Sequence, residues 1–384
     1  MLESRRIYLP PLSLVGPDSL KELVEELKGL PYKKALLVTD KALNELGMAK
    51  TIADMIVEAG LEYVIYDNVQ PNPTTENVHT GLKKLQDEQC DVIISLGGGS
   101  PQDAAKAIGI LATNGGNIAD YEGVHISKLP STPIVAINTT AGTASEVTIN
   151  YVITDEKRNV KMVMVDKNCL VSIAVNDPKL MIGMPKSLTA ATGLDALTHA
   201  IEAYITVGAF HWSDDLALYA IKLVSQSLVK AVENGEDLEA RSQMAWAQFI
   251  AGQSFSNAGL GFVHSMAHQL GGQYDIPHGV ANAVLLPHVM RYNAKVCAAK
   301  LKNVAEAMGV DVTGMTNEQG AEAAIDAIIK MAERVNIPSG IGALGAKEED
   351  IELMAENALK DICAPGNPRE VTFEDAVELF KVAM

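Results

Sequence analysis

The first half of the chain alternates short apolar runs with amphipathic stretches, and this alternation limits the possible folds more than any other feature. Amphipathic stretches at 42–59 and 74–88 predict helices. Strands that alternate with helices in this way form βα units around a parallel sheet. We therefore expect an α/β domain, with strands at 35–39, in LEYVIYD, in CDVIISL (90–96) and in PIVAIN (133–138).

The pattern changes from about Lys186 onward. Helix-type periodicity then dominates, as in SLTAATGLDALTHAIEAYI and DDLALYAIKLVSQSLVKAVENG. A chain of 384 residues is long enough for two domains. We place the boundary near Gly183, between an α/β domain at 1–183 and an all-helical domain at 184–384.

Composition narrows the class of protein. Hydrophobic residues make up 48% of the chain and charged residues 21%, and no apolar run approaches the roughly 20 residues that span a bilayer. The N-terminal residues do not have the pattern of a secretory signal, so we expect a cytoplasmic protein without a membrane partner. The net charge of −17 makes nucleic acid an unfavourable partner. Four scattered cysteines without a CxxC pair predict free thiols.

A glycine-rich loop follows the third expected strand. The glycines at 97–99 let the backbone turn sharply, Ser100 suits the N-cap of a helix, Pro101 its first position and Asp103 a capping box. The free N–H groups of such a helix favour a phosphate. A second loop at 138–148, rich in hydroxyl groups, follows the next strand. The two loops together predict a pyrophosphate site, although a plain tight turn explains the glycines equally well.

Asp40 closes the first expected strand. Its carboxylate could accept hydrogen bonds from the ribose hydroxyls of an adenosine and would repel a 2′-phosphate, which favours NAD over NADP. It could equally be the N-cap of the helix that follows. The sequence leaves both roles open.

Histidines cluster between residues 261 and 279. His264 and His268 lie four apart, so a helix would place them on one face. We expect Gly271, Gly272 and Pro277 to break that helix, so that His278 comes from a turn or from the start of the next segment.

Asp195 and His199 form a second pair at helical spacing. One carboxylate and several imidazoles predict a metal site, whereas the alternative is a set of buried histidines that only pack in the core. HSMAH has Ser265 where a zinc protease has its general-base glutamate, so the HExxH motif is missing.

Four long motifs together resemble the iron-dependent, or group III, alcohol dehydrogenases. They are GGGSPQDAAKA, TTAGTASEVT, TAATGLDALTHAIEAY and GFVHSMAHQLGGQYDIPHGVANAVLLPH, and the resemblance covers the chain from Ile7 to its end. It implies a Rossmann-like NAD-binding domain followed by an all-α metal-binding domain, the dehydroquinate synthase-like fold. It also implies a homodimer or a larger homo-oligomer, in which a short alternating segment near the N-terminus could add to a partner's sheet edge.

The resemblance also implies site residues. The metal ligands are Asp195, His199, His264 and His278, while His268 lies between metal and nicotinamide without being a ligand. Asp195, His264 and His268 are the catalytic residues. The substrate pocket takes Asn150, Val152, Phe255 and Cys363. The NAD-contacting positions are Asp40, Asn72, Gly98, Gly99, Ser100, Asp103, Thr139, Thr140, Thr143, Asn150, Lys161 and Leu180.

The chemistry of the ligand set agrees with this assignment. Hydride transfer from an alcohol requires loss of the hydroxyl proton, and a divalent cation stabilises the resulting charge. Nitrogen and oxygen ligands without thiolate suit Fe²⁺, with Zn²⁺ possible in its place. His268 could relay the proton, or could only pack beside the nicotinamide. We also hypothesise that Cys363, near a redox-active iron, is a site of oxidative inactivation.

The expected activity is interconversion of a short alcohol or diol with its aldehyde. Within this family, the resemblance carried by TINYVITDE (148–156), Phe255 and CAPGNPRE (363–370) implies lactaldehyde and propane-1,2-diol as substrates, with ethanol and propane-1,3-diol as near alternatives. Two other classes remain possible at this point. One is a metal-dependent hydrolase or lyase that needs no NAD, and the other is a non-catalytic metal or nucleotide binder.

Overall fold

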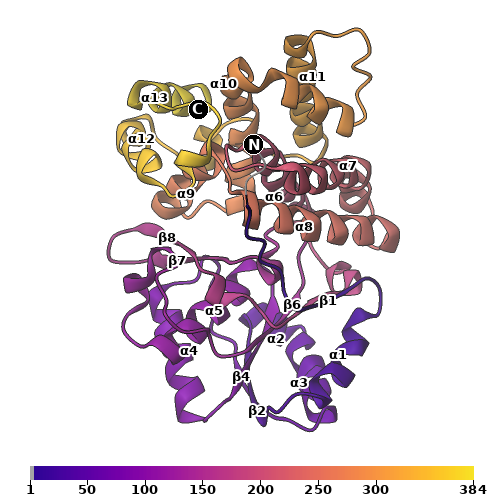
Figure 1. Ribbon diagram of the computed structural model, residues 1–384, viewed down its shortest axis with the longest axis vertical. Coiled ribbons are helices and arrows are strands. Elements are labelled where there is room, and N and C mark those ends of the chain that lie inside the picture. Colours follow the sequence, from indigo (N-terminus) through magenta and orange to yellow (C-terminus); the bar gives the residue numbers. More distant parts are fainter. Residues whose placement is uncertain (1–3) are drawn as a thin grey trace. The chain divides into compact units, whose positions relative to one another are not determined.

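The computed structural model describes residues 4–384, which form two compact units (Figure 1). The first contains the chain up to Thr140 together with Ala144–Met181, and the second contains Ala141–Thr143 and Ile182–Met384. The division after Met181 is adjacent to the boundary that the sequence places near Gly183. Residues 141–143 differ from that expectation. Gly142 belongs to the second unit because its backbone bonds His199 and lies against Thr192.

A six-stranded sheet, parallel throughout, forms the centre of the first unit. All four expected strands are present, and they are the last four in the strand order of this sheet. Two short strands at one edge were not foreseen, because a run of four residues has little periodicity to detect. The order is β1 (Leu12–Val15), β9 (Ile173–Asn176), β6 (Ile134–Asn138), β4 (Val92–Gly97), β2 (Lys34–Val38) and β3 (Glu62–Tyr66).

Helices cover both faces of this sheet (Figure 1). On one face, α1 (Ser19–Lys28) and α3 (Met48–Glu58) pack their apolar sides against alternate residues of β2 and β4. On the other face lie α4 (Thr75–Asp87) and α5 (Gly99–Asn114), which contact each other. The single helix expected at 42–59 is in fact two, α2 (Lys41–Glu45) and α3. The break is at Gly47, whose φ of 81° is a left-handed conformation that favours glycine.

A small second sheet lies in the same unit. Strands β7 (Asn150–Asp155) and β8 (Val160–Val165) form an antiparallel hairpin, and β5 (Gly123–Val124) pairs with β8 in parallel. Two charged side chains of α5, the buried Lys106 and the half-buried Asp103, hold the hairpin against this helix. Lys106 Nζ donates to the carbonyl oxygens of Thr148 and Asn150, and Asp103 accepts from the Val152 N–H.

The second unit contains only helices among its described residues, as the sequence predicts. Helix α6 is its central element: nearly every residue of α6 is buried, and it packs against α7, α8 and α10. Among residues 4–384, no helix combines the length and apolar character needed to cross a membrane. The helices are α6 (Lys186–Ile205), α7 (His211–Glu233), α8 (Leu238–Ala258), α9 (Phe262–Tyr274), α10 (His278–Ala307), α11 (Asn317–Arg334), α12 (Ile351–Lys360) and α13 (Phe373–Val382).

The histidine-rich segment folds differently from expectation at one point. Helix α9 continues through Gly271 and Gly272 and ends at Tyr274, so the two glycines do not break it. Gly271 is buried and Gly272 is half-buried, and tertiary packing of the helix outweighs the roughly 1 kcal/mol penalty of a glycine. The helix ends where Asp275 adopts a left-handed φ of 53°. His278 is the first residue of α10, one of the two placements that the sequence allowed.

Candidate metal centre and nucleotide loops

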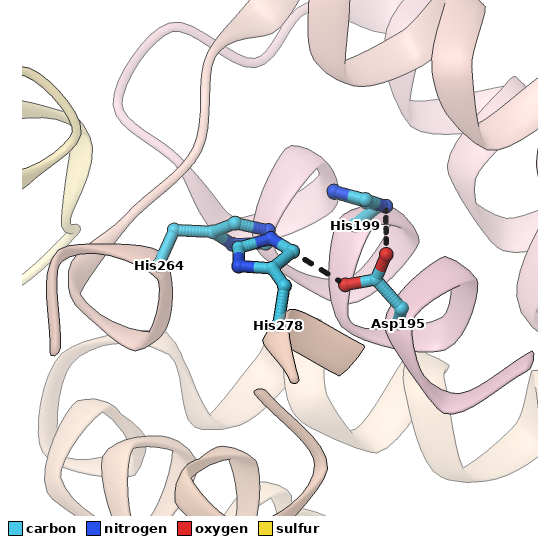
Figure 2. Close-up of side chains that lie close together, drawn as sticks. All are labelled: Asp195, His199, His264 and His278. Atoms are coloured by element: carbon cyan, nitrogen blue, oxygen red, sulfur yellow. Dashed lines mark ion pairs between the residues drawn. The ribbon is translucent and has the colours of Figure 1, made fainter. Parts of the chain in front are cut away.

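Three helices of the second unit bring the four predicted metal ligands together (Figure 2). Asp195 and His199 lie one turn apart on α6, and both are buried. His264 is in the first turn of α9 and His278 begins α10. One ligand atom from each side chain lies within 4.8 Å of all the others.

The contacts within this cluster are specific. Asp195 Oδ2 lies 3.9 Å from His199 Nδ1, and Asp195 Oδ1 lies 3.7 Å from His278 Nε2. The rings of His199 and His264 are stacked with centroids 4.7 Å apart. The carboxylate of Asp195 therefore faces the imidazoles, as Figure 2 shows.

Burial keeps the imidazoles neutral. It lowers the pKa of His199 to about 4 and that of His264 to about 3, so both rings keep a lone pair at neutral pH. His199 Nδ1 is buried and has no hydrogen-bond partner. Neutral imidazoles with one carboxylate are the donors that Fe²⁺ or Zn²⁺ takes. The residues present thus fit a divalent cation.

Asn282, which the sequence analysis did not identify, lies against the same cluster. It is fully buried on α10, and its Nδ2 donates to Asp195 Oδ1 at 2.7 Å. The same nitrogen is 3.1 Å from Nε2 of both His264 and His278. Three of the predicted ligand atoms therefore point toward a common centre. Its only sequence signal is the position four residues after His278.

His268 lies beside the cluster and is held by a second carboxylate. Its Nδ1 is 2.8 Å from Asp361 Oδ2, and its ring is stacked on His278 at 5.5 Å. Although burial acts to raise the pKa of Asp361, the adjacent His268 and the hydrogen bonds around it hold that pKa below the usual range. The carboxylate therefore stays ionised, and it fixes the orientation of the His268 ring.

The predicted substrate residues divide between the two units. Phe255, on α8, is stacked on the His199 ring at 4.3 Å, and Cys363 donates its backbone N–H to Asp361. Asn150 and Val152 lie on β7 of the first unit. Burial raises the pKa of the Cys363 thiol well above its usual value, which disfavours the thiolate that oxidation requires. The oxidation hypothesis stays a prediction.

In the first unit, the glycine-rich loop starts a helix two residues earlier than expected. Helix α5 begins at Gly99 with Gly98 as N-cap, so neither the Ser100 cap nor the Asp103 capping box forms. The Asp103 carboxylate is used elsewhere, since it accepts from Ser145 Oγ at 2.7 Å and from the Val152 N–H at 3.0 Å. These two donors, which are distant in the sequence, take the carboxylate that a local cap would have used.

The two predicted nucleotide loops approach each other closely. A Cβ on Gly98 would lie 2.8 Å from Thr140 Cγ2 and 2.9 Å from Thr140 Oγ1, so no side chain fits there. Thr140 Oγ1 is buried and has no hydrogen-bond partner. Bare backbone at the N-terminus of a 16-residue helix, next to an unpaired hydroxyl, suits a phosphate-bearing cofactor such as NAD.

The other predicted NAD positions lie as follows. Lys161 and Asn72 are joined by a hydrogen bond from Lys161 Nζ to Asn72 Oδ1. Thr139 is the first residue after β6. Leu180 is in a 3₁₀ turn at Pro178–Met181, whereas Thr143 belongs to the second unit. Asp40 is the N-cap of α2 and accepts from the Leu43 N–H at 2.9 Å. The capping role of Asp40 is therefore real, and its role toward ribose stays a prediction.

Comparison with known proteins identifies the family. Residues 10–178 match the iron-containing alcohol dehydrogenases, and residues 189–384 match the C-terminal part of the Fe-containing alcohol dehydrogenase family. The chain belongs to the iron-containing alcohol dehydrogenase family.

Full-length relatives support this membership. An NAD-dependent methanol dehydrogenase from Bacillus methanolicus is 46% identical over 98% of this chain and 99% of its own. Lactaldehyde reductase from Escherichia coli (strain K12) is 47% identical over 99% of this chain and all of its own. A crystal structure of a 1,3-propanediol oxidoreductase superposes with a TM-score of 0.97 at 47% identity, with both chains fully covered.

Membership confirms the expected fold class and the expected class of enzyme. This iron-containing alcohol dehydrogenase is an oxidoreductase, which decides against the hydrolase, lyase and non-catalytic alternatives.

Proposed function

We propose that the protein is an NAD- and iron-dependent enzyme that interconverts lactaldehyde and propane-1,2-diol. The observation that carries the proposal is the convergence of Asp195, His199, His264 and His278 within 4.8 Å, with the first three buried and His278 half-buried. The relatives named for lactaldehyde, 1,3-propanediol and methanol support a short alcohol as substrate.

The four convergent side chains would hold the metal. A divalent cation bound there would supply Lewis acidity that stabilises negative charge on the alcohol oxygen, and bound NAD would be the hydride acceptor. The chain's own residues provide the surroundings. Asp195, His199 and His264 are buried, and this low exposure to water strengthens charge interactions at the site.

His268 is the residue that we propose moves the alcohol proton. Because the Asp361 carboxylate accepts from Nδ1, the proton of the neutral ring sits on Nδ1 and the lone pair on Nε2. Nε2 is then ready to accept a proton. In the direction of aldehyde reduction the same nitrogen returns it.

We propose Fe²⁺ as the resident metal, and Zn²⁺ is the alternative against which the proposal is tested. Nitrogen and oxygen donors bind both ions, so the donor set alone does not choose between them. Elemental analysis of anaerobically purified protein tests this. Iron as the main bound metal supports the proposal, and zinc in active protein without iron contradicts it.

A substrate panel tests the proposed reaction. The relatives named lactaldehyde reductase, 1,3-propanediol dehydrogenase and methanol dehydrogenase are 47%, 48% and 46% identical, so overall identity does not rank their substrates. The panel compares propane-1,2-diol, propane-1,3-diol and ethanol, and we expect the highest kcat/KM for propane-1,2-diol. Apolar pockets separate such substrates by only about 1–3 kcal/mol. An ethanol value far above that of propane-1,2-diol would reject the ranking.

We further propose that the enzyme acts as a homodimer or larger homo-oligomer in the cytoplasm, with no nucleic-acid or membrane partner. Strand β1 supports self-association because it is an edge strand, with β9 on one side only. Light scattering at micromolar concentration tests the assembly. A single species of 40.9 kDa would contradict it.

A further inference from the structure

Glu202 is a buried carboxylate that none of the predicted roles uses. It lies on α6 with 1% of its surface exposed. Its Oε2 is 2.6 Å from His264 Nδ1 and also accepts from the Gly261 N–H at 3.1 Å. Its Oε1 accepts from the Val263 N–H at 2.7 Å.

These contacts fix the start of α9. The first N–H groups of a helix lack partners within the helix, and Gly261, its N-cap, has no side chain to supply one. Glu202 supplies the acceptor from α6. A Cβ on Gly261 would lie 2.9 Å from Glu202 Oε1, so the glycine is what lets the backbone approach the carboxylate.

The position of Glu202 on α6 connects it to the predicted metal ligands. Asp195, His199 and Glu202 follow one another at i, i+4 and i+7, which places them on one face of the helix. The first two are predicted ligands and the third holds His264. A single carboxylate thereby joins the two helices that carry three of the four ligands.

The hydrogen bond to His264 also determines which nitrogen faces the cluster. Because a carboxylate accepts, His264 Nδ1 carries the proton and Nε2 carries the lone pair. Nε2 is the atom that lies 3.1 Å from Asn282 Nδ2, on the side of the other ligands. Both Glu202 oxygens also accept backbone N–H groups, which fixes the side chain as an acceptor behind the ring, and such an acceptor makes the Nε2 lone pair a stronger donor.

We propose that Glu202 is a positioning residue that orients His264 and strengthens the metal site. The inference rests on the proposed function in one respect, namely that the four side chains bind a divalent cation. Carboxylates that hold a metal-binding histidine typically contribute about 10- to 100-fold in metal affinity. Glu202 makes that contribution here through His264.

The test measures metal affinity instead of turnover. Apoprotein is titrated with Co²⁺ in competition with a chromophoric chelator, for the wild type and for Glu202→Gln. The amide keeps the size of the side chain and can still accept one backbone N–H, but it replaces one of the two acceptor oxygens, which hold His264 and the start of α9, by an NH₂ group. We expect the Kd for Co²⁺ to rise by about 10- to 100-fold, with a changed visible spectrum of the bound Co²⁺.

Two controls separate positioning from folding. Glu239→Gln makes the same change at an exposed site on α8, and should alter neither Kd nor Tm. Asn367→Ala removes a different acceptor at the start of α9, Asn367 Oδ1, which lies 3.4 Å from the Phe262 nitrogen. It should lower the Tm of the apoprotein while leaving the Kd within about twofold, since effects at separate contacts are nearly independent.

The outcomes are distinct. A wild-type Kd in Glu202→Gln, with a Tm lowered as in Asn367→Ala, would show a purely structural role and overturn the inference. If Glu202→Gln does not fold, Glu202→Asp replaces it. Asp keeps the charge but shortens the reach, and a wild-type Kd there would equally overturn the inference. A wild-type protein that fails to bind Co²⁺ at all would reject the proposed metal centre itself.

Discussion

The two units prepare their predicted sites by different means. In the first, the loops after β4 and β6 offer bare backbone and small hydroxyl side chains, and charged residues behind them hold a hairpin in place. In the second, buried side chains from α6 and α9 and the half-buried His278 of α10 converge on one point. The first arrangement depends on the absence of side-chain atoms where a cofactor would bind, and the second depends on the positions of individual ligand atoms. Single substitutions should therefore affect function most in the second unit.

The largest effect is expected for His264→Ala. It removes one of the four convergent side chains, so the amount of bound metal should fall to background. The rate of aldehyde reduction should fall by more than about 100-fold, because even residues that only hold a metal ligand in place contribute up to about 100-fold. His211→Ala, at an exposed position on α7, is the matched control and should retain both. Metal content and turnover are measured together. Full activity in His264→Ala would show that the cluster is not the catalytic centre.

The same contrast explains how much the sequence could predict. The i, i+4 pair Asp195 and His199 and the apolar strands were found because their signals are local and periodic. Glu202 and Asp361 were missed because they meet His264 and His268 across 62 and 93 residues. Asp103 was assigned to a local cap because its partners, Ser145 and Val152, are distant in the sequence. The roles of Glu202, Asp361 and Asp103 depend on hydrogen bonds to residues that are distant in the sequence, and local patterns do not reveal such bonds.

The next largest effect is expected for Lys106→Met in the first unit. Lys106 is fully buried and donates to the carbonyl oxygens of Thr148 and Asn150 at 2.9 and 2.8 Å. Losing these bonds leaves two buried acceptors without that donor, whereas relief of a buried charge offsets part of the cost. We expect the free energy of unfolding to fall by about 2 kcal/mol, as measured by urea denaturation.

Lys106 also predicts a pH dependence. Burial lowers its pKa below the ordinary 10.5, so the unfolded chain binds more protons as the pH approaches that value. The wild type should therefore gain stability relative to Lys106→Met as the pH rises through this range. Lys50→Met, at an exposed site paired with Asp54, should show neither effect. Equal stabilities of the Lys106 and Lys50 variants would mean that the hairpin is held by other contacts.

A smaller effect is expected at Gly98, where the glycine-rich loop of the first unit has no room for a side chain. Gly98→Ala would place a Cβ 2.8 Å from Thr140 Cγ2, and this overlap should cost about 1.5 kcal/mol and weaken NAD binding. The double variant Gly98→Ala/Thr140→Ala should recover most of the stability, because it removes the atoms in the way. Gly29→Ala, with only an ordinary contact at 3.6 Å, serves as control. An additive double variant would exclude the overlap as the cause.

The smallest effect separates the two roles of Asp40. Asp40→Ala should lower the free energy of unfolding by about 1 kcal/mol, because α2 loses its N-cap. Asp40→Ser keeps a capping oxygen and should unfold like the wild type. It lacks the carboxylate, however, so NAD affinity measured by titration should still fall and discrimination against NADP should weaken if the side chain also contacts ribose. Unchanged affinity for both cofactors in Asp40→Ser would leave Asp40 as a helix cap alone, and the first unit would then bind its cofactor without any charged contact at this position.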